Sequence, residues 1–410
     1  MTSHNIITNI DIGSSKIRTL IGYFDEDNNE NFHILGLGIS ASNAIRKGNI
    51  LDMEEFKNNL DKSLEEAEKM AGEQVSGAYL SFNSSSIEVV KNRGIVAISG
   101  NEISNDDIER SLDMAKSGID SSNKEIIKVI PESFVVDLEE GVKNPIGMSA
   151  RKLEVIVNIF LINTNVLNNI KKAVSDVGIE IYDIFPNLLA SPEGVLTKRQ
   201  KELGVVCIDI GTSTTGITVF EGGTLRYSSV IPIGGDNVTN DIALGLRTST
   251  VIAEKLKLEL AELSLGKEEG YKDKEIDLSK EVGEELIVSK VYLSDIVTAR
   301  YEEIFSYIKE ELKKIGKDGM LPEGAVCVGG GVKIKGFIEL GKNELRLPVF
   351  IGIPVPKDEL IESSINDPVF AAVVGAMIMS NKFGGNGKSF SINIGGFFVS
   401  IVNIFKKLLP

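Results

Sequence analysis

The sequence feature that most constrains the fold is a hairpin motif that occurs twice, about half a chain apart. The first copy is NIDIGSSKIRTLIGYF at residues 9–24, and the second is CIDIGTSTTGITVFEGG at residues 207–223. Each copy predicts a β-branched strand, a turn of small residues and a second strand. A hairpin repeated in this way indicates two related halves built on one plan. The matching positions are Asp11 with Asp209, Gly13 with Gly211, and Ser15 with Ser213.

Between the two hairpins, helical and strand patterns alternate. Residues 54–71 predict an amphipathic helix, and a second helix is expected to begin at Ser104, which is followed by acidic residues. The charge-rich stretch 262–290 is expected to be solvated. Residues 384–396 are rich in Gly, Ser and Asn, which is typical of a short flexible linker. This mixture predicts an α/β or α+β chain.

Composition and charge narrow the class of protein. The chain has 410 residues, enough for two or more domains with a large buried core. Its formal net charge of −15 argues against nucleic acid as a partner, because phosphate binding needs a basic face. Cys207 and Cys327 are the only cysteines and lie in apolar runs, which fits reduced thiols in a cytosolic protein. We find no secretory leader and no apolar run of about 20 residues, the length that spans a bilayer.

The two hairpin turns have the residue types of a triphosphate site. Glycine and serine let backbone N–H groups approach phosphate oxygens, and the preceding carboxylate can hold Mg²⁺ through water. A single such turn is more often an ordinary tight hairpin, but two copies in register favour a cleft with one turn on each side of the phosphates. The predicted phosphate-binding residues are Asp11, Gly13, Ser14, Ser15, Lys16, Asp209, Gly211, Thr212, Ser213 and Thr214, and Asp11 and Asp209 are also the predicted Mg²⁺ residues.

Two later segments carry glycines that suit the rest of a nucleotide. The glycine pair at 234–235 precedes a helix, where free N–H groups and the helix dipole favour phosphate. The glycine run at 329–331 ends an apolar strand and lets the backbone pass close to adenine, although a glycine-capped turn explains it equally well. Glu254 and Lys257 share one helix face, where they contact ribose and base or form a solvated ion pair. The predicted residues are Gly234 and Gly235 for phosphate, and Glu254, Lys257, Gly330 and Gly331 for adenosine.

These four elements, in this order, resemble the actin-like ATPase superfamily. Residues 367–377 resemble the last connecting helix of that superfamily, and residues 185–196 lie where its first connecting helix lies. The resemblance implies an α/β, actin-like fold of the duplicated ribonuclease H-like kind. Two lobes would surround a nucleotide cleft that binds ATP and Mg²⁺.

Three segments are more specifically similar to the FtsA family of bacterial cell division. Residues 129–155 closely resemble the signature of the inserted 1C subdomain, and residues 47–72 and 233–257 match other segments of the family. The similarity covers roughly residues 5–380, with Ser213 where the family usually has a glycine-rich turn. The implied subdomains are 1A at 1–82, continued at 163–203 and 367–384; 1C at 83–162; 2A at 204–233, continued at 322–366; 2B at 234–321; then a linker at 385–396 and a membrane-targeting helix at 397–410.

The family resemblance also implies partners and a role. Such a protein polymerises and tethers filaments of FtsZ, the tubulin-like division protein, to the cytoplasmic face of the membrane at the division site, with weak ATPase activity at most. The predicted helix at 294–315 lies in the 2B subdomain, which binds the C-terminal tail of FtsZ in the family. Arg300 and Glu303 match positions in that surface, although exposed charges on a solvated helix face often contribute nothing measurable.

The C-terminal segment predicts an amphipathic helix. Apolar residues line one side of FFVSIVNIFKKLL, and Ser400, Asn403 and Lys407 line the other. A helix of this length extends about 20 Å, too short to span a bilayer. No acidic residue follows Asp367, so the basic segment fits a helix lying in the plane of anionic lipid, and the glycines before it favour this over docking on the protein core. The predicted membrane contacts are Phe397, Phe398, Ile401, Ile404, Phe405, Lys406, Lys407 and Leu408.

Three other functions remain open from the residues. A PilM-like pilus assembly adaptor has a related fold but needs no amphipathic tail, and it would bind a pilus peptide. A sugar or acetate kinase would need a carboxylate base facing its substrate, and the sequence indicates no such residue. A shape-determining filament of the MreB kind would lack the 1C-like segment. The C-terminal segment and residues 129–155 therefore favour the FtsA-like interpretation.

Overall fold

The first half of the protein is organised around a five-stranded sheet. The computed structural model describes residues 5–25, 32–120, 122–264, 273–279, 287–354 and 362–383. In this first sheet the strand order is β11-β6-β1-β2-β3, with β1 antiparallel to β2 and parallel to β6. The strands are β1 (Ile6–Ile12), β2 (Lys16–Phe24), β3 (Phe32–Ala41), β6 (Gly77–Phe82) and β11 (Glu180–Pro186).

A second five-stranded sheet repeats this arrangement. Its order is β14-β13-β12-β17-β18, with β12 antiparallel to β13 and parallel to β17. In each sheet the first strand therefore forms a hairpin on one side and a parallel pair on the other, so the duplication inferred from the two hairpins is confirmed. The strands are β12 (Val205–Ile210), β13 (Thr215–Glu221), β14 (Thr224–Ile231), β17 (Ala325–Val328) and β18 (Val349–Ile351).

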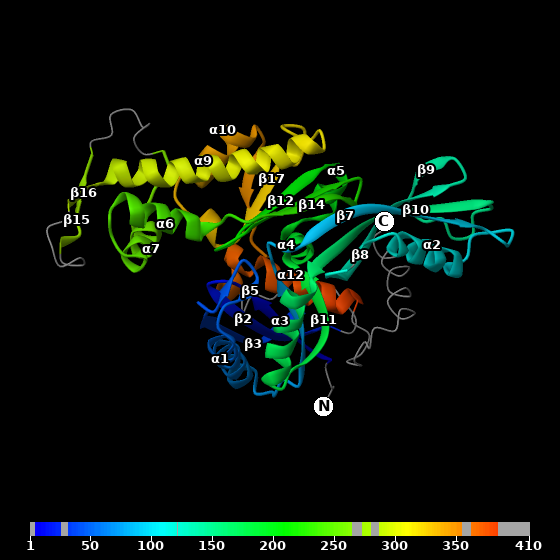
Figure 1. Cartoon of the computed structure of the whole chain (residues 1–410), viewed down its shortest axis with the longest axis horizontal. Coiled ribbons are helices and arrows are strands. Elements are labelled where there is room, and N and C mark those ends of the chain that lie inside the picture. The colour runs from blue at the N-terminus through cyan, green and yellow to red at the C-terminus, as the bar shows by residue number, and fades with distance from the viewer. Residues whose placement is uncertain are drawn as a thin grey trace.

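Helices cover the sheets and separate the lobes. In Figure 1 the α1 and α3 helices lie with the first sheet, α9 and α10 lie with the second, and α4 and α12 run between the two lobes. The helices are α1 (Met53–Ala71), α3 (Thr164–Asp176), α4 (Asn187–Val195), α5 (Lys198–Leu203), α6 (Gly235–Gly245), α7 (Thr250–Glu259), α9 (Lys290–Lys314), α10 (Phe337–Leu345), α11 (Glu362–Ile365) and α12 (Ala371–Phe383). Short elements complete the chain: β4 (Ile45–Arg46), β5 (Asn49–Ile50), β15 (Glu275–Asp277), β16 (Ile287–Ser289), η2 (Gly330–Lys333) and η3 (Pro368–Phe370).

An inserted sheet extends from one side of the two lobes (Figure 1). Its order is β7-β10-β8-β9, and α2 packs its buried residues into a separate hydrophobic core with this sheet. Lys128 on β8 is joined to Asp183 on β11 by an ion pair of 2.5 Å, which ties the insertion to the first lobe. The elements are β7 (Glu88–Ala97), α2 (Asn105–Ser117), β8 (Lys124–Val136), β9 (Glu139–Val142) and β10 (Lys152–Asn163).

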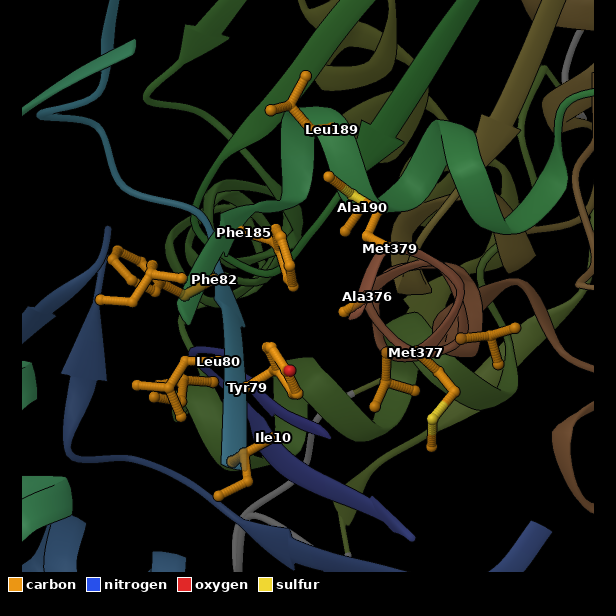
Figure 2. Packing of buried hydrophobic residues seen from close by; sticks show 14 of the residues in the cluster. Ile10, Tyr79, Leu80, Phe82, Phe185, Leu189, Ala190, Ala376, Met377 and Met379 are labelled. Carbon is orange, nitrogen blue, oxygen red and sulfur yellow. The ribbon is translucent and has the colours of Figure 1, made fainter. Parts of the chain in front are cut away.

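The α4 and α12 helices cross with their backbones in contact. A Cβ atom added to Gly375 would lie 1.7 Å from the carbonyl oxygen of Ala190, and one added to Gly194 would lie 2.3 Å from that of Ala371. Figure 2 shows Ala190 of α4 beside Ala376 of α12, within the buried cluster that joins both helices to the first sheet. Glycine therefore permits this close crossing between the lobes.

Two expectations from the sequence need correction. The helix expected at 294–315 is α9, which begins earlier, at Lys290, because Ser289 caps it by accepting a hydrogen bond from the Tyr292 backbone N–H. The stretch from Glu262 is not uniformly solvated: Glu262 is buried, and its carboxylate pairs with Lys290 and Lys335. The many charged residues in this stretch predicted exposure to water. The two lysines neutralise the Glu262 carboxylate, which allows its burial.

The linker and the helix predicted for residues 385–410 lie outside the described residues. Within the described ranges, no helix is both long and apolar enough to cross a membrane.

Candidate functional site

The turns of the two repeated hairpins face each other. The Ser14 Oγ lies 2.7 Å from the Ser213 Oγ, and the Thr212 hydroxyl donates to the Ser15 Oγ over 2.9 Å. Both contacts connect the β1–β2 turn of one lobe with the β12–β13 turn of the other. The structure thus brings the two predicted phosphate-binding turns together, although the first and second hairpins are far apart in the chain.

The start of α6 supports the second turn. The backbone N–H groups of Gly235 and Asp236 donate to the carbonyl oxygens of Gly211 and Thr212, over 3.0 and 2.7 Å. Inside the turn, the Gly211 N–H donates to the Thr214 carbonyl over 2.9 Å. The first amides of this helix therefore hold the turn in place. The predicted contact of Gly234 and Gly235 with phosphate stays a prediction.

Asp11 lies at the end of β1, behind the first turn. Its Oδ1 accepts hydrogen bonds from Asn187 Nδ2 at 3.1 Å and from the Ser81 hydroxyl at 3.3 Å, while Arg18 Nη1 lies 3.5 Å from Oδ2. Burial raises the pKa of Asp11, and the positive charge of Arg18 opposes that shift. The carboxylate is thus buried, oriented by two neutral donors and partly neutralised.

Asp209 occupies the equivalent position in the second lobe. The Ser191 hydroxyl donates to its Oδ2 over 2.7 Å. Burial raises the pKa of Asp209 to about 6; the Ser191 hydrogen bond opposes this rise, and the nearby charge of Asp11 adds to it. The two carboxylates therefore repel each other electrostatically, so a cation between them would relieve an unfavourable interaction.

These side chains fit a hydrated divalent cation. Mg²⁺ keeps several waters and is usually held by one or two carboxylates, which matches Asp11 and Asp209. The Asn187 Oδ1 is buried without a hydrogen-bond partner, and it is an acceptor that a metal-bound water could satisfy. No group of three or more His, Cys, Asp or Glu residues arranged for direct metal ligation occurs among the described residues.

A cavity of about 110 Å³ lies between the two turns. Most of the residues predicted to bind phosphate line it, together with others that the sequence did not indicate. The predicted residues in its lining are Asp11, Gly13, Ser14, Ser15, Asp209, Gly211, Thr212, Ser213, Thr214 and Gly330. The predicted residues outside its lining are Lys16, Gly234, Gly235, Glu254, Lys257 and Gly331.

Several lining residues were missed by the sequence analysis. Arg18, Asn83 and Asn187 line the cavity. Pro368 and Val369 of η3 and Ala371 and Ala372 of α12 line it as well. Arg18 lies directly opposite Asp11 in the β1–β2 register. The short hairpin turn in the sequence could therefore have indicated that Arg18 lies near Asp11. Asn83 and Asn187 follow β6 and β11, and no local pattern marks them. They come to the site only because β6 pairs with β1 and β11 pairs with β6 in the same sheet.

The glycine run after β17 meets the second hairpin closely. Gly329 has φ +88°, and a Cβ there would lie 2.6 Å from Asp209 Oδ1. A Cβ on Gly331 would lie 2.4 Å from a side-chain methyl of Ile210, whereas one on Gly330 would meet nothing within 4 Å. Of the two glycines predicted to contact adenosine, Gly330 therefore faces open space, and Gly331 is packed against β12.

Glu254 and Lys257 form an ion pair on α7, with Lys257 Nζ 2.6 Å from Glu254 Oε2. Lys257 Nζ also donates to the Thr239 hydroxyl at 2.8 Å and to the Gly235 carbonyl at 3.2 Å. The ammonium group therefore lies at the first turn of α6. The predicted contact of both side chains with adenosine stays a prediction.

The predicted partner-binding residues lie on α9. Arg300 Nε and Nη2 donate to the two carboxylate oxygens of Asp241 on α6, over 2.5 and 2.9 Å, and Arg300 also pairs with Glu303. This fork joins two helices, so Arg300 has a structural contact in addition to any role in binding.

The sequence matches two family models. One is described as "Cell division protein FtsA" and matches residues 206–375, and the other is "SHS2 domain inserted in FTSA" and matches residues 84–161. Relatives named "Cell division protein FtsA" match almost the whole chain. The protein from Pseudomonas aeruginosa is 34% identical over 393 residues, covering 95% of this chain and 93% of the relative. The chain belongs to the FtsA family.

Other members and more distant structures agree with this assignment. The FtsA proteins of Escherichia coli K12 and Bacillus subtilis are 30% and 32% identical, covering 95% and 86% of this chain and 93% and 80% of those relatives. The PilM–PilN type IV pilus biogenesis complex matches with a TM-score of 0.61 at 14% identity, covering 92% of this chain and 98% of that one. MreB5 of Spiroplasma citri bound to ADP matches with a TM-score of 0.55 at 14% identity, covering 93% and 99%. At these identities the two structures establish only the actin-like fold, which the sequence predicted for this FtsA family member.

Proposed function

We propose that this member of the FtsA family binds ATP with Mg²⁺, assembles into filaments and tethers FtsZ filaments to the cytoplasmic face of the cell membrane at the division site. The observation that carries the nucleotide proposal is the convergence of two hydroxyl-rich turns, with Ser14 and Ser213 in contact. Behind the turns lie the buried carboxylate of Asp11 and the partly buried carboxylate of Asp209. Backbone amides and hydroxyls in such turns suit phosphate oxygens.

In this proposal the residues of the turns, Asp11–Lys16 and Asp209–Thr214, surround the phosphates. Bound Mg²⁺ would neutralise part of the phosphate charge. Asp11 and Asp209 orient its water shell, and Asn187 Oδ1 accepts from one of those waters. Gly330 leaves room beside the second turn for adenosine, with Gly331, Glu254 and Lys257 nearby, and the glycine pair Gly234 and Gly235 completes the phosphate side.

Nucleotide binding would also change the relation between the lobes. Pockets for small ligands usually enclose roughly 300–1,000 Å³, whereas the cavity between the turns encloses about 110 Å³. A cavity of this size suits the phosphates more than a whole nucleotide, and in this proposal the lobes turn about the crossing of α4 and α12 when ATP enters. Bound nucleotide would then favour the conformer that assembles into filaments.

The direct test of nucleotide binding is a titration of a fluorescent ATP analogue with the full chain in the presence of Mg²⁺. Saturable binding that unlabelled ATP reverses and GTP does not is the expected result. If no adenine nucleotide binds at millimolar concentration, the nucleotide part of the proposal fails.

We assign the FtsZ contact to the 2B subdomain, residues 234–321, around Arg300 and Glu303. This region also exposes large apolar side chains: Leu244 and Val251 are each 78% exposed and Leu258 is 73% exposed. Exposed apolar groups rimmed by charges are typical of protein-binding surfaces. Fluorescence anisotropy with a peptide of the FtsZ C-terminal tail tests the assignment, comparing the natural chain with Glu303→Lys. Unchanged affinity in that variant would contradict a role for Glu303.

Membrane attachment is proposed for the segment 397–410, which lies outside the described residues, after a linker at 385–396. Each subunit would contribute one weak lipid helix, so a filament would bind anionic lipid by avidity. The test is co-sedimentation with anionic liposomes and Mg·ATP, comparing the full chain with one that ends after Phe383. That end keeps all of α12, including the 2.8 Å contact of Lys382 with Glu193.

Two further outcomes sharpen the membrane test. The full-length variant Ile401→Asp with Phe405→Asp keeps the chain length but removes the apolar face, so it should stay in the supernatant like the truncated chain. If the full chain and the truncation pellet equally, segment 397–410 is not the anchor and the membrane part of the proposal fails. We also propose for this chain the subdomain boundaries that the family resemblance implies.

A further inference from the structure

The β8 strand of the inserted sheet contacts both lobes. Lys128 on β8 pairs with Asp183 on β11, the edge strand of the first sheet, at 2.5 Å. Further along β8, the Glu132 carboxylate accepts a hydrogen bond of 2.8 Å from Arg226 Nη1 on β14, the edge strand of the second sheet. In Figure 1, β8 is seen next to both β11 and β14. A change in the angle between the lobes must therefore disturb one of these two contacts.

Both partners of the ion pair with the second lobe are bulge residues. The register of β8 with β10 omits Glu132, and the register of β14 with β13 omits Arg226. A β-bulge gives the side chain of its extra residue a new direction. Two separate bulges thus direct opposite charges at each other across the boundary between the inserted sheet and the second lobe.

The contact with the first lobe is the more durable of the two. The inserted sheet is continuous in the chain with the first lobe at both ends, because β7 follows β6 and β10 precedes α3. The Lys128 side chain is only 4% exposed, and its Nζ lies 4.7 Å from the centroid of the Phe185 ring. Separating a buried charge from its partner is costly. The inserted sheet should therefore move together with the first lobe.

The contact with the second lobe can open at lower cost. The Arg226 side chain is 39% exposed and donates to Glu132 through Nη1, while its Nε has no hydrogen-bond partner among the described residues. This is not the two-bond fork that makes arginine–carboxylate pairs strong. If Arg226 moves away, Lys91 Nζ, 2.6 Å from Glu132 Oε2, still neutralises the carboxylate. The second lobe can then separate without leaving an unpaired buried charge.

We propose that this contact is a latch that holds the two lobes at the angle seen in the structure. It consists of the Glu132–Arg226 pair and the 2.9 Å hydrogen bond from Asn158 Nδ2 to the Leu225 carbonyl oxygen. The inference rests on the proposed nucleotide function, in which the lobes turn when ATP enters. A latch that favours the arrangement with the small cavity opposes this turn, so opening the latch should raise the affinity for ATP. The inserted sheet would thereby control a cavity that none of its described residues lines.

The first test measures the distance between spin labels on the two lobes without nucleotide. The labels are attached at Lys62→Cys on α1 and Glu310→Cys on α9, which are exposed positions. The natural cysteines, Cys207 and Cys327, are buried and should not react. Arg226→Gln should broaden or shift the distance distribution relative to the natural chain. Arg226→Lys keeps the charge and should restore the natural distribution.

The second test measures the dissociation constant of ATP in Mg²⁺ by a competition titration with a fluorescent ATP analogue. Arg226→Gln should bind ATP at least about fivefold more tightly, the lower end of typical coupling factors between sites. Arg93→Gln is the matched control. Arg93 also pairs with a buried carboxylate, at 3.1 Å from Glu154, but both residues belong to the inserted sheet. This variant should change neither the distance distribution nor the ATP affinity.

The outcomes separate the latch from the nucleotide proposal. If Arg226→Gln leaves the distance distribution unchanged, the latch is wrong. If the distribution changes but the ATP affinity does not, the contact does not control the cleft and the inference fails in that part. If the natural chain binds no nucleotide, the nucleotide proposal fails, and the distance measurement alone decides whether the contact holds the lobes. Should Arg226→Gln not fold, Asn158→Ala replaces it, because it removes the other hydrogen bond of the latch, and the same outcomes apply.

Discussion

The side-chain oxygens of Ser14 and Ser213 lie 2.7 Å apart although 199 residues separate them in the chain. Ser213 Oγ also accepts a hydrogen bond of 2.8 Å from the Lys47 backbone N–H. One buried hydroxyl therefore joins the second hairpin turn to two separate segments of the first lobe.

Replacing Ser213 with alanine should destabilise the fold more than replacing Ser14. Ser213→Ala removes the acceptor of a backbone N–H as well as the hydroxyl pair, which predicts a loss of about 1–2 kcal/mol in the free energy of unfolding. Ser14→Ala removes only the hydroxyl pair and should cost about 0.5–1 kcal/mol. Urea unfolding measures both values. Equal losses would mean that Lys47 does not depend on Ser213 in solution.

Asp11→Asn should reduce the dependence of ATP binding on Mg²⁺. The neutral amide cannot attract the hydrated cation, so the ratio of ATP dissociation constants in EDTA and in Mg²⁺ should fall by about tenfold relative to the natural chain. The measurement is the same competition titration, with Mg²⁺ varied at fixed protein. Asp106→Asn is the control, because Asp106 lies on α2, the helix that packs against the inserted sheet. An unchanged ratio in Asp11→Asn would remove Asp11 from the metal site.

Gly375→Ala should disrupt the crossing of α4 and α12. The added Cβ would lie 1.7 Å from the Ala190 carbonyl oxygen, and a backbone atom cannot move aside by changing rotamer. We expect a loss near the upper end of overpacking costs, about 3 kcal/mol. The control is Gly245→Ala, where the nearest atom is the Ile296 Cδ1 at 2.6 Å, the end of a flexible side chain.

Thermal unfolding of the two glycine variants provides the comparison. Gly375→Ala should unfold at a clearly lower temperature than Gly245→Ala. If the two variants melt at the same temperature, the helices separate easily and their close approach contributes little to stability.

The free energy of unfolding should depend on pH because Glu193 forms an ion cluster with two lysines. Its carboxylate on α4 pairs with Lys201 on α5 and with Lys382 on α12. Burial alone would raise the pKa of Glu193, but the two lysines outweigh it and lower that pKa to about 2. Because the pKa is lower in the folded state, the stabilisation is present above pH 4.5, the ordinary value, and is lost as the pH falls towards 2.

The variant Glu193→Gln should therefore lose about 2–3 kcal/mol at pH 7, and this difference from the natural chain should shrink between pH 4.5 and pH 2. Urea unfolding across this range measures it. Glu339→Gln is a suitable control, because Glu339 is 76% exposed in its ion pair with Lys342, and surface pairs contribute little. A difference that does not change with pH would show that the cluster acts through packing and not through charge.

Much of the local structure was predictable from the sequence. The helix expected at 54–71 is α1, with Asp52 capping its first turn and Gly72 ending it at φ +71°. Capping, turn and alternation signals act over a few residues, so a local stretch of sequence contains them in full. The repeated hairpins likewise predicted the two equivalent sheets and about half of the cavity lining, because turn chemistry and strand register are local properties.

Only the tertiary structure determined which of these elements meet and which charges are buried. Asn187 reaches Asp11, and Glu262 is buried between two lysines, because strands and helices from distant parts of the chain pack together there. A local sequence pattern does not give the distance between residues of the two lobes. It therefore cannot reveal that Ser213 contacts Ser14 or that Arg18 retains an unpaired donor. The sequence by itself thus determined the two halves and their turns, and the packing of one half against the other determined the site between them.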